Sequence, residues 1–157
     1  MSLKESLVGT WRLISYVERN VETGEERHPM GLEPTGFIIY TADGYMSVQL
    51  EAHGRGKFAS GDMFGGSFAE YTEAGRSYLA YAGPFAVDEV NRKLHHQIGV
   101  SLFPNWEGNA QVRLAELKGD RLKLSFERPQ LSNGVLRDAE LTWERAPIHD
   151  TAFRPAA

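Results

Sequence analysis

The stretch AQVRLAELKGDRLKLSFE, residues 110–127, has the clearest strand pattern in the chain. Apolar and polar residues alternate on both sides of Gly119-Asp120, as in two half-buried strands joined by a tight turn. A two-residue turn fixes which residues face each other across the hairpin. The pairs that it places on the apolar face are Leu117–Leu122, Ala115–Leu124 and Arg113–Phe126. The stretch therefore predicts an antiparallel hairpin with Arg113 on its inward face and a wet outer face that includes the pair Glu116–Lys123.

Similar strand patterns recur along the rest of the chain. Short runs rich in Val, Ile, Leu, Tyr and Phe alternate with turn residues, and the 16 glycines make such turns frequent. This rhythm is typical of a mostly β protein with antiparallel pairing. We expect strands at 8–19, 35–42, 45–51, 84–88, 93–103, 110–118, 121–128 and 138–145.

Two further hairpins have registers that can be predicted. If Asp43-Gly44 is a two-residue turn, the core face carries the pairs Thr41–Met46, Ile39–Val48 and Phe37–Leu50. A four-residue loop at 89–92 places Phe85 opposite His96. Neighbouring residues on a strand point to opposite faces, so the adjacent His95 faces outward. The inward set of that strand is then Leu94, His96, Ile98, Val100 and Leu102.

One segment breaks the strand rhythm in the middle of the chain. Ser67 and Glu70 match a capping box, and Gly83-Pro84 is a stop signal. Apolar residues recur between them at helical spacing, which predicts a single amphipathic helix over 68–82. The glycine-rich stretch 52–66 before it is read either as a mobile lid or as an ordinary connection.

Composition limits the class of protein. A chain of 157 residues with 41% hydrophobic and 24% charged residues is typical of one globular domain, here 1–157. The net charge of -4 and the scattered Lys and Arg argue against nucleic-acid and membrane partners. Without cysteines, disulfides and thiol chemistry are excluded. The amino-terminal MSLKESLVGTW has no long apolar segment, so a cytoplasmic location is expected.

Three blocks of sequence resemble a known family. LVGTWRL at 7–13, GFIIYTADGYMSVQL at 36–50 and HHQIGVSLFPNWEGNAQVRLAELKGDRLKLS at 95–125 are similar to the lipocalin-like domain of bacterial and fungal proteins, a calycin-type fold. The resemblance implies an up-and-down antiparallel β-barrel of about eight strands, enclosing a pocket for a small, largely apolar molecule. The one mid-chain α-helix that the spacing predicts departs from secreted lipocalins, whose helix follows the last strand. It also implies that Trp11 plugs one barrel end beneath Arg145. Some fungal members lie beside polyketide pathways and are regarded as isomerases or cyclases.

His96 and Arg113 are the strongest candidates for a site. An inward His96 is either a hydrogen-bonded core residue or an acid/base facing a ligand. An inward Arg113 pairs with a buried carboxylate, stacks at the barrel mouth, or binds a carboxylate, enolate or phenolate of a ligand. The candidate ligand-binding residues are His96, Arg113, Phe85, Phe126, Tyr40 and His95. The five histidines lack metal-ligand spacing, so no metal site is expected.

Three functions follow from these residues. The first is binding of a small hydrophobic molecule that carries a polar group, without a cofactor. The alternative is a cofactor-independent isomerase or cyclase that acts on a small carbonyl-containing, polyketide-like substrate through His96 and Arg113. The third is an interaction module that uses the 52–66 loop and Trp106. An open barrel edge or an exposed helix would allow a homodimer, but nothing in the sequence requires one.

Overall fold

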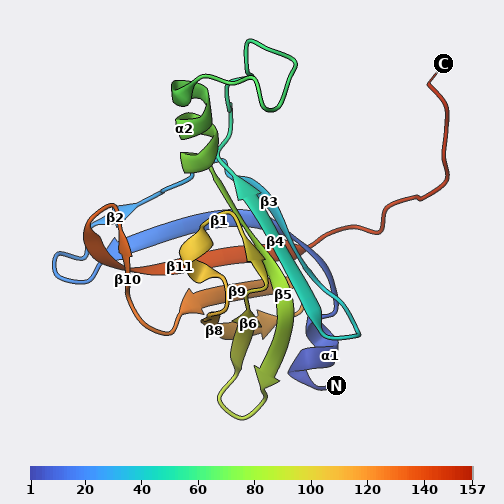
Figure 1. The fold of residues 1–157 in the computed structure, drawn as a ribbon. Coiled ribbons are helices and arrows are strands. Elements are labelled where there is room, and N and C mark those ends of the chain that lie inside the picture. The colour runs from blue at the N-terminus through green and yellow to red at the C-terminus, as the bar shows by residue number, and fades with distance from the viewer. Residues whose placement is uncertain (157) are drawn as a thin grey trace.

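Eight strands close into an antiparallel barrel in the computed structural model, which describes residues 1–156 (Figure 1). Each strand pairs with the next in the order β1, β3, β4, β5, β6, β8, β9 and β11, and β11 pairs back with β1. This closure removes the free edges that an open sheet would leave. The predicted barrel is therefore confirmed. Its strands are β1 (Gly9–Asn20), β3 (Thr35–Tyr40), β4 (Tyr45–Glu51), β5 (Tyr78–Asp88), β6 (Lys93–Gln97), β8 (Ala110–Lys118), β9 (Arg121–Phe126) and β11 (Val135–Arg145).

Shorter elements decorate the barrel. β2 (Glu26–Arg27) pairs with the end of β1, and β10 (Gln130–Ser132) pairs with the start of β11. Because those two barrel strands are antiparallel neighbours, β2 and β10 lie at the same end of the barrel (Figure 1). β7 (Val100–Ser101) pairs with β5. The helices are α1 (Leu3–Leu7), α2 (Phe68–Arg76) and a single 3-10 turn, η1 (Pro104–Trp106).

The two hairpins nearest the candidate site have the predicted registers. In the β8–β9 hairpin, Arg113 lies opposite Phe126 and Leu117 opposite Leu122. On the outer face of the same hairpin, Lys123 forms an ion pair of 2.8 Å with Glu116. In the β5–β6 hairpin, Phe85 lies opposite His96. His96 and Arg113 are both buried, so the inward orientation of each is confirmed.

The β3–β4 register differs from the prediction by one residue. Tyr40 pairs with Met46 and Ile38 with Val48, so the predicted pairs Thr41–Met46, Ile39–Val48 and Phe37–Leu50 are wrong. The cause is the turn: the Thr41 amide donates to the Tyr45 carbonyl, and the loop comprises residues 42–44, with Gly44 at a φ of +95°. One extra loop residue moves the whole of β3 by one position and reverses its faces. As a result, Ile38 and Tyr40 are buried, while Phe37 and Ile39 are exposed.

The mid-chain helix is shorter than predicted. It begins at the expected capping box, where Ser67 and Glu70 bond to each other's backbone amides, but it ends at Arg76. Residues 78–82, expected in the helix, belong to β5, which pairs with β4 from Tyr78–Glu51 to Pro84–Tyr45. Sheet pairing outweighs the local helical spacing. β6 in turn ends at Gln97, so the predicted inward residues Val100 and Leu102 are exposed.

The barrel end away from β2 and β10 is closed as the resemblance implies. Trp11 is fully buried, and its indole N–H donates to the Leu7 carbonyl at 2.9 Å. The Arg145 guanidinium lies 4.1 Å from the centre of the Trp11 ring, a cation–π contact. Arg145 also donates to the backbone carbonyls of Ser6 and Val8, which fixes α1 against the barrel. The Trp11–Arg145 pairing is therefore confirmed.

Beyond the barrel, residues 147–156 carry no helix or strand and extend away from it (Figure 1). None of the helices within residues 1–156 is long and apolar enough to cross a membrane.

Two glycine substitutions test the sheet packing. A Cβ on Gly83 in β5 would lie 2.0 Å from the Gln97 carbonyl oxygen, whereas a Cβ on Gly75 in α2 would meet nothing within 4 Å. We expect Gly83→Ala to lower the free energy of unfolding by about 1–3 kcal/mol. The matched Gly75→Ala should leave it unchanged or raise it by up to about 1 kcal/mol. Urea denaturation of both variants checks this, and equal midpoints would show that β5 does not pack as described.

Candidate ligand-binding site

A cavity of about 180 Å³ lies inside the barrel. Its wall is mostly apolar, but a set of polar side chains interrupts it. The apolar residues are Ile38, Val48, Leu50, Leu79, Trp106, Leu124, Phe126, Leu131, Leu141 and Trp143, and the polar ones are Tyr16, Glu18, Tyr81, His96, Arg113, Gln130 and Ser132. An apolar cavity with a few convergent polar groups is the usual form of a small-molecule site.

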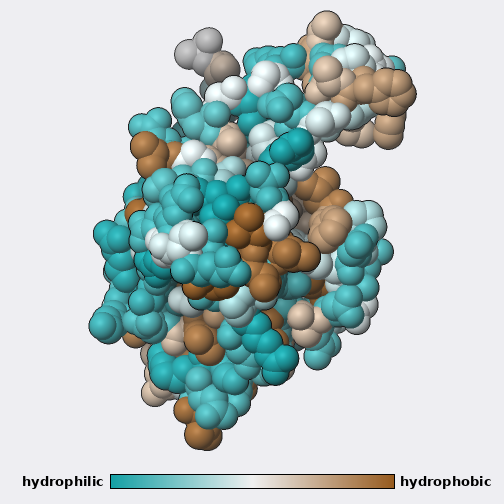
Figure 2. Space-filling model, turned by 90° about the vertical axis from the view of Figure 1, so that its left-hand side faces the viewer, coloured by the Kyte–Doolittle hydropathy of each residue, from teal (hydrophilic) through white to brown (hydrophobic). Residues whose placement is uncertain are grey.

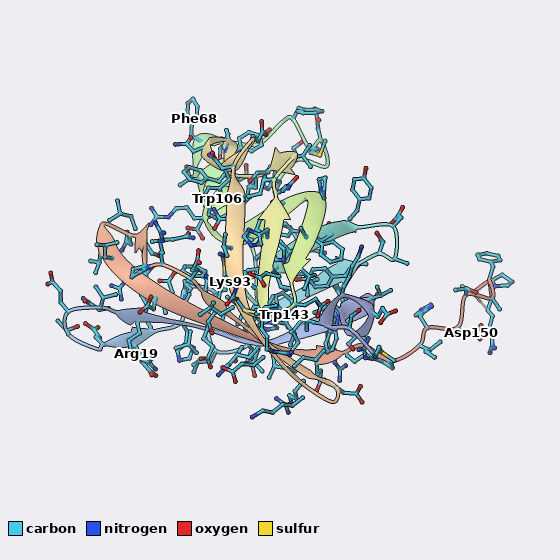
Figure 3. The ribbon with its side chains drawn as sticks, turned by 90° about the horizontal axis from the view of Figure 1, so that it is seen from below. Arg19, Phe68, Lys93, Trp106, Trp143 and Asp150 are labelled. Atoms are coloured by element: carbon cyan, nitrogen blue, oxygen red, sulfur yellow. The ribbon has the colours of Figure 1, made fainter. Side chains whose placement is uncertain are left out.

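The cavity reaches the surface beside β10. Leu131 of β10 lines the cavity and is 75% exposed, so it belongs to both the wall and the outer surface. Figure 2 shows a hydrophobic patch surrounded by hydrophilic surface on the face of the molecule that carries β2 and β10. In Figure 3, Trp143 lies among the crossing strands, whereas Phe68 lies at the outer margin of the molecule. The cavity therefore opens at the β2–β10 end, opposite the Trp11 plug.

His96 is held between two tyrosines. Its side chain is 1% exposed, with Nε2 2.8 Å from the Tyr40 hydroxyl and Nδ1 2.9 Å from the Tyr81 hydroxyl. A neutral imidazole has one N–H donor and one acceptor nitrogen, so one tyrosine donates to the ring and the other accepts from it. The three side chains come from β3, β5 and β6, and this clamp fixes the ring. Of the two tyrosines, Tyr81 lines the cavity.

The clamp is uncharged near neutral pH. Burial, with smaller contributions from the charges of Arg113 and His95, lowers the pKa of His96 to about 3. Burial also raises the pKa of Tyr40 and that of Tyr81 above the usual value for tyrosine. The clamp therefore presents hydroxyl and imidazole dipoles, not charges, to the cavity.

Arg113 brings a positive charge into the cavity wall. Its side chain is 6% exposed and stacks on Phe126 at 4.4 Å from the ring centre. It donates to the Val112 carbonyl and to the Gln111 side-chain oxygen, each at 3.1 Å. None of the ion pairs formed within residues 1–156 includes Arg113. Arg113 also contacts the Tyr81 hydroxyl, where its charge and a hydrogen bond oppose the rise in the tyrosine pKa that burial causes. Because a guanidinium has five N–H donors, donors remain for another acceptor.

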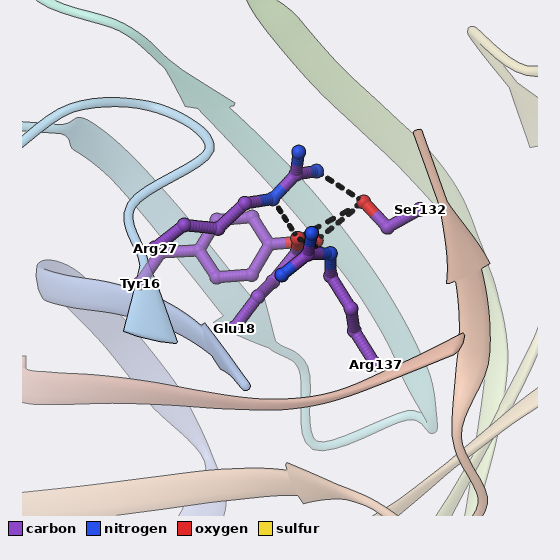
Figure 4. Close-up of polar contacts among 5 residues, drawn as sticks. All are labelled: Tyr16, Glu18, Arg27, Ser132 and Arg137. Atoms are coloured by element: carbon purple, nitrogen blue, oxygen red, sulfur yellow. Dashed lines mark hydrogen bonds and ion pairs between the residues drawn. The ribbon is translucent and has the colours of Figure 1, made fainter. Parts of the chain in front are cut away.

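A second polar cluster lines the cavity around Glu18 (Figure 4). Glu18 is 3% exposed and accepts from Arg27 at 2.7 Å and from the Tyr16 hydroxyl at 3.2 Å. The Ser132 hydroxyl lies 2.9 and 3.0 Å from its two oxygens. Arg137 Nε lies 3.9 Å away, and its Nε and Nη1 atoms are buried without a hydrogen-bond partner among the described residues. The cluster ties β1, β2, β10 and β11 together at the cavity mouth.

Sequence reasoning missed the Glu18 cluster because of a bulge in β1. Trp11 and Leu13 face inward, so strict alternation would point residues 15 and 17 inward and Glu18 outward. The pairing with β11 shifts register between Leu13 and Ser15. After this bulge Tyr16 and Glu18 become the buried residues. The extra residue reverses which residues of β1 point into the barrel. Nothing in the local sequence pattern marks the position of the bulge.

The structure brings together three of the six candidate residues at the cavity wall. These are His96, Arg113 and Phe126. Tyr40 and Phe85 pack behind the wall, with their rings edge to face at 4.9 Å, and Tyr40 acts through its bond to His96. His95 lies half-buried on the outer face of β6, opposite Ala86 and Val112, and does not line the cavity.

Comparisons with known proteins match most of the chain. The profile of a family described as "Lipocalin-like domain" matches residues 8–146. The chain is also similar to the 4'-hydroxy-3'-methoxypropiophenone carrier protein ppsC of Aspergillus oryzae. The two are 33% identical over 108 residues, which cover 65% of this chain and 97% of that protein.

The clamp predicts a pH-dependent stability. The folded-state pKa of His96, about 3, is below the value of 6.5 expected when the chain is unfolded. The unfolded chain thus binds the extra proton as pH falls below about 6.5, and folding loses up to about 1.4 kcal/mol per pH unit. Above that pH the contribution is constant. We expect His96→Gln, which offers the tyrosines an amide instead, to lack this slope between about pH 6.5 and 5. Urea denaturation at several pH values measures it, and identical slopes would contradict a buried neutral His96.

Proposed function

The chain belongs to the lipocalin-like domain family, and we propose that it binds a small, largely apolar molecule with a polar group inside its barrel. The observation that carries this proposal is Arg113, a buried cation without a carboxylate partner in residues 1–156, at the wall of an apolar cavity. Burying an unpaired charge costs several kcal/mol, on the order of the whole stability of a domain. A ligand acceptor at the free N–H groups offsets that cost.

The size of the cavity favours a ligand with one ring. A dry cavity of about 150 Å³ in another protein holds benzene, so about 180 Å³ has room for one aromatic ring with short substituents. The relative from Aspergillus oryzae is named for a propiophenone, a single-ring aryl ketone with hydroxyl and methoxy groups. Both considerations support a substituted aryl ketone, or a molecule of similar size and polarity, as the ligand of this chain.

The wall supplies both kinds of contact that such a ligand requires. Phe126, Trp143 and Trp106 present aromatic surface to the cavity. Arg113 presents charged donors, and the Tyr81 hydroxyl adds a neutral group beside it. We place the oxygen of the ligand at Arg113 and its ring among the aromatic side chains.

The enzymatic alternative, a cofactor-independent isomerase or cyclase, rests on one observation: His96 and Arg113 line the same cavity. The state of His96 favours binding over proton transfer. Both ring nitrogens are engaged by tyrosines, and burial lowers the pKa of His96 to about 3, far below the range of an effective general base. Trp106 lines the cavity, which favours a ligand contact over the role in protein interaction that the sequence allowed.

Isothermal titration with 4'-hydroxy-3'-methoxypropiophenone tests the proposal. We expect saturable binding with one molecule per chain, and recovery of the compound unchanged after incubation. Arg113→Gln should weaken binding about tenfold to a hundredfold, because it removes a charge-assisted hydrogen bond.

The matched control is Arg154→Gln, which removes an arginine from the exposed tail and should leave the affinity unchanged. Equal affinities for the wild type and Arg113→Gln would contradict the assignment of the site, and conversion of the compound would favour the enzyme.

A further inference from the structure

The groups around the cavity carry an excess of positive charge. Arg113 lies in the wall, and Arg27 and Arg137 flank the single wall carboxylate, Glu18. The cavity is therefore surrounded by three guanidinium groups and one carboxylate, although the whole chain has a net charge of -4. Arg27 is partly exposed, so solvent screens its charge, but Arg113 and Arg137 are buried. Even if Arg27 is discounted, Glu18 balances only one of the two buried cations.

The remaining polar groups at the cavity do not supply the missing negative charge. Tyr81 and Tyr40 on one side and Tyr16 on the other stay protonated, because burial raises the pKa of each hydroxyl. His96 is neutral. The other two polar wall residues are Gln130, which donates to Gln111 at 2.7 Å, and Ser132, and neither is charged.

Unused donors point to the same conclusion. Two nitrogens of Arg137, Nε and Nη1, are buried without a hydrogen-bond partner in residues 1–156. Arg113 has five N–H groups, more than its bonds to Val112, Gln111 and Tyr81 use. Buried donors without acceptors are rare in folded proteins. Arg113 lines the cavity directly, whereas Arg137 acts on it from behind Glu18.

We propose that the cavity takes its ligand as a monoanion whose charged oxygen lies against Arg113. The proposal rests on the proposed function and adds the charge of the ligand. For a hydroxyaryl ketone, the anion is the phenolate, and the phenolic proton leaves to solvent on binding. Burial disfavours an anion, but buried guanidinium groups in a low-dielectric wall favour it more strongly, since each contributes both charge and hydrogen bonds. A ring that carries a carboxylate would supply the same charge.

The test compares three probes of similar size on the wild-type protein. 4'-Hydroxypropiophenone can ionise, 4'-methoxypropiophenone cannot, and 4-ethylbenzoate is an anion throughout the range of about pH 6 to 9. Binding is measured by titration calorimetry. The ultraviolet spectrum of bound 4'-hydroxypropiophenone reports its ionisation, because a phenolate absorbs at longer wavelength than the phenol.

The expected result is a phenolate spectrum for the bound hydroxy compound at a pH at least about one unit below the transition of the free compound. Its affinity should exceed that of the methoxy compound at least about tenfold and rise with pH below the free transition. Relative affinities of the phenolate and 4-ethylbenzoate then identify which anion fits. A neutral-phenol spectrum with an unshifted transition, together with equal binding of the methoxy compound, would overturn the proposal. Binding of none of the three would instead overturn the proposed function.

Variants locate the charge responsible. Arg113→Gln should return the transition of the bound phenol to that of the free compound, whereas Arg113→Lys should keep most of the shift because it keeps the charge. Arg154→Gln serves as the control for loss of a remote arginine. A shift that survives in Arg113→Gln would contradict the placement of the anion at Arg113. The wild-type spectra remain decisive if a variant does not fold.

Discussion

The burial of the Arg113 guanidinium inside an apolar barrel is the constraint on which the rest of the site depends. The charge is held by the ring of Phe126 and by three oxygen atoms, those of the Val112 carbonyl, the Gln111 amide and the Tyr81 hydroxyl. These groups orient the side chain but do not neutralise it. Barrel closure by the β1–β11 pairing keeps water from reaching it through an open sheet edge. The fold therefore maintains a positive centre that a bound molecule is suited to complete.

Two polar systems flank this centre, and they have different characters. The Tyr40–His96–Tyr81 clamp is neutral, fully buried and hydrogen-bonded at both ring nitrogens. The Glu18 cluster is charged and joins the mouth strands β2 and β10 to the barrel. The clamp thus shapes the interior wall, while the cluster holds the entrance. Neither system pairs Arg113 with a carboxylate, so Arg113 is the group on which the proposed ligand binding depends.

The parts of the fold that the sequence predicts are those fixed by local chemistry. Gly119-Asp120 sets the β8–β9 register correctly, and with it the inward Arg113, because the turn has two residues as expected. The Asp43-Gly44 loop includes one more residue, and the faces of β3 are reversed. The capping box at Ser67 locates the start of α2, but sheet pairing of β5 determines where the helix ends.

The site is predictable only in part, because local sequence patterns place some of its residues and the closed barrel brings the others together. His96, Arg113 and Phe126 lie on strands with regular alternation, and sequence places them inward. Glu18 follows a bulge, and its partners Arg27, Ser132 and Arg137 come from distant segments that only the closed barrel brings together. Tyr81 lies in a stretch that reads locally as helix, so its contact with His96 could not be anticipated.

A crystal structure of the protein with 4'-hydroxypropiophenone would show where the ligand binds and what its oxygen contacts. We expect one ligand inside the barrel, with its charged oxygen about 2.7–2.9 Å from a nitrogen of Arg113 and its ring among Phe126, Trp106 and Trp143. A ligand bound elsewhere, or an Arg113 side chain that pairs with a carboxylate of the protein while the cavity stays closed, would contradict this expectation.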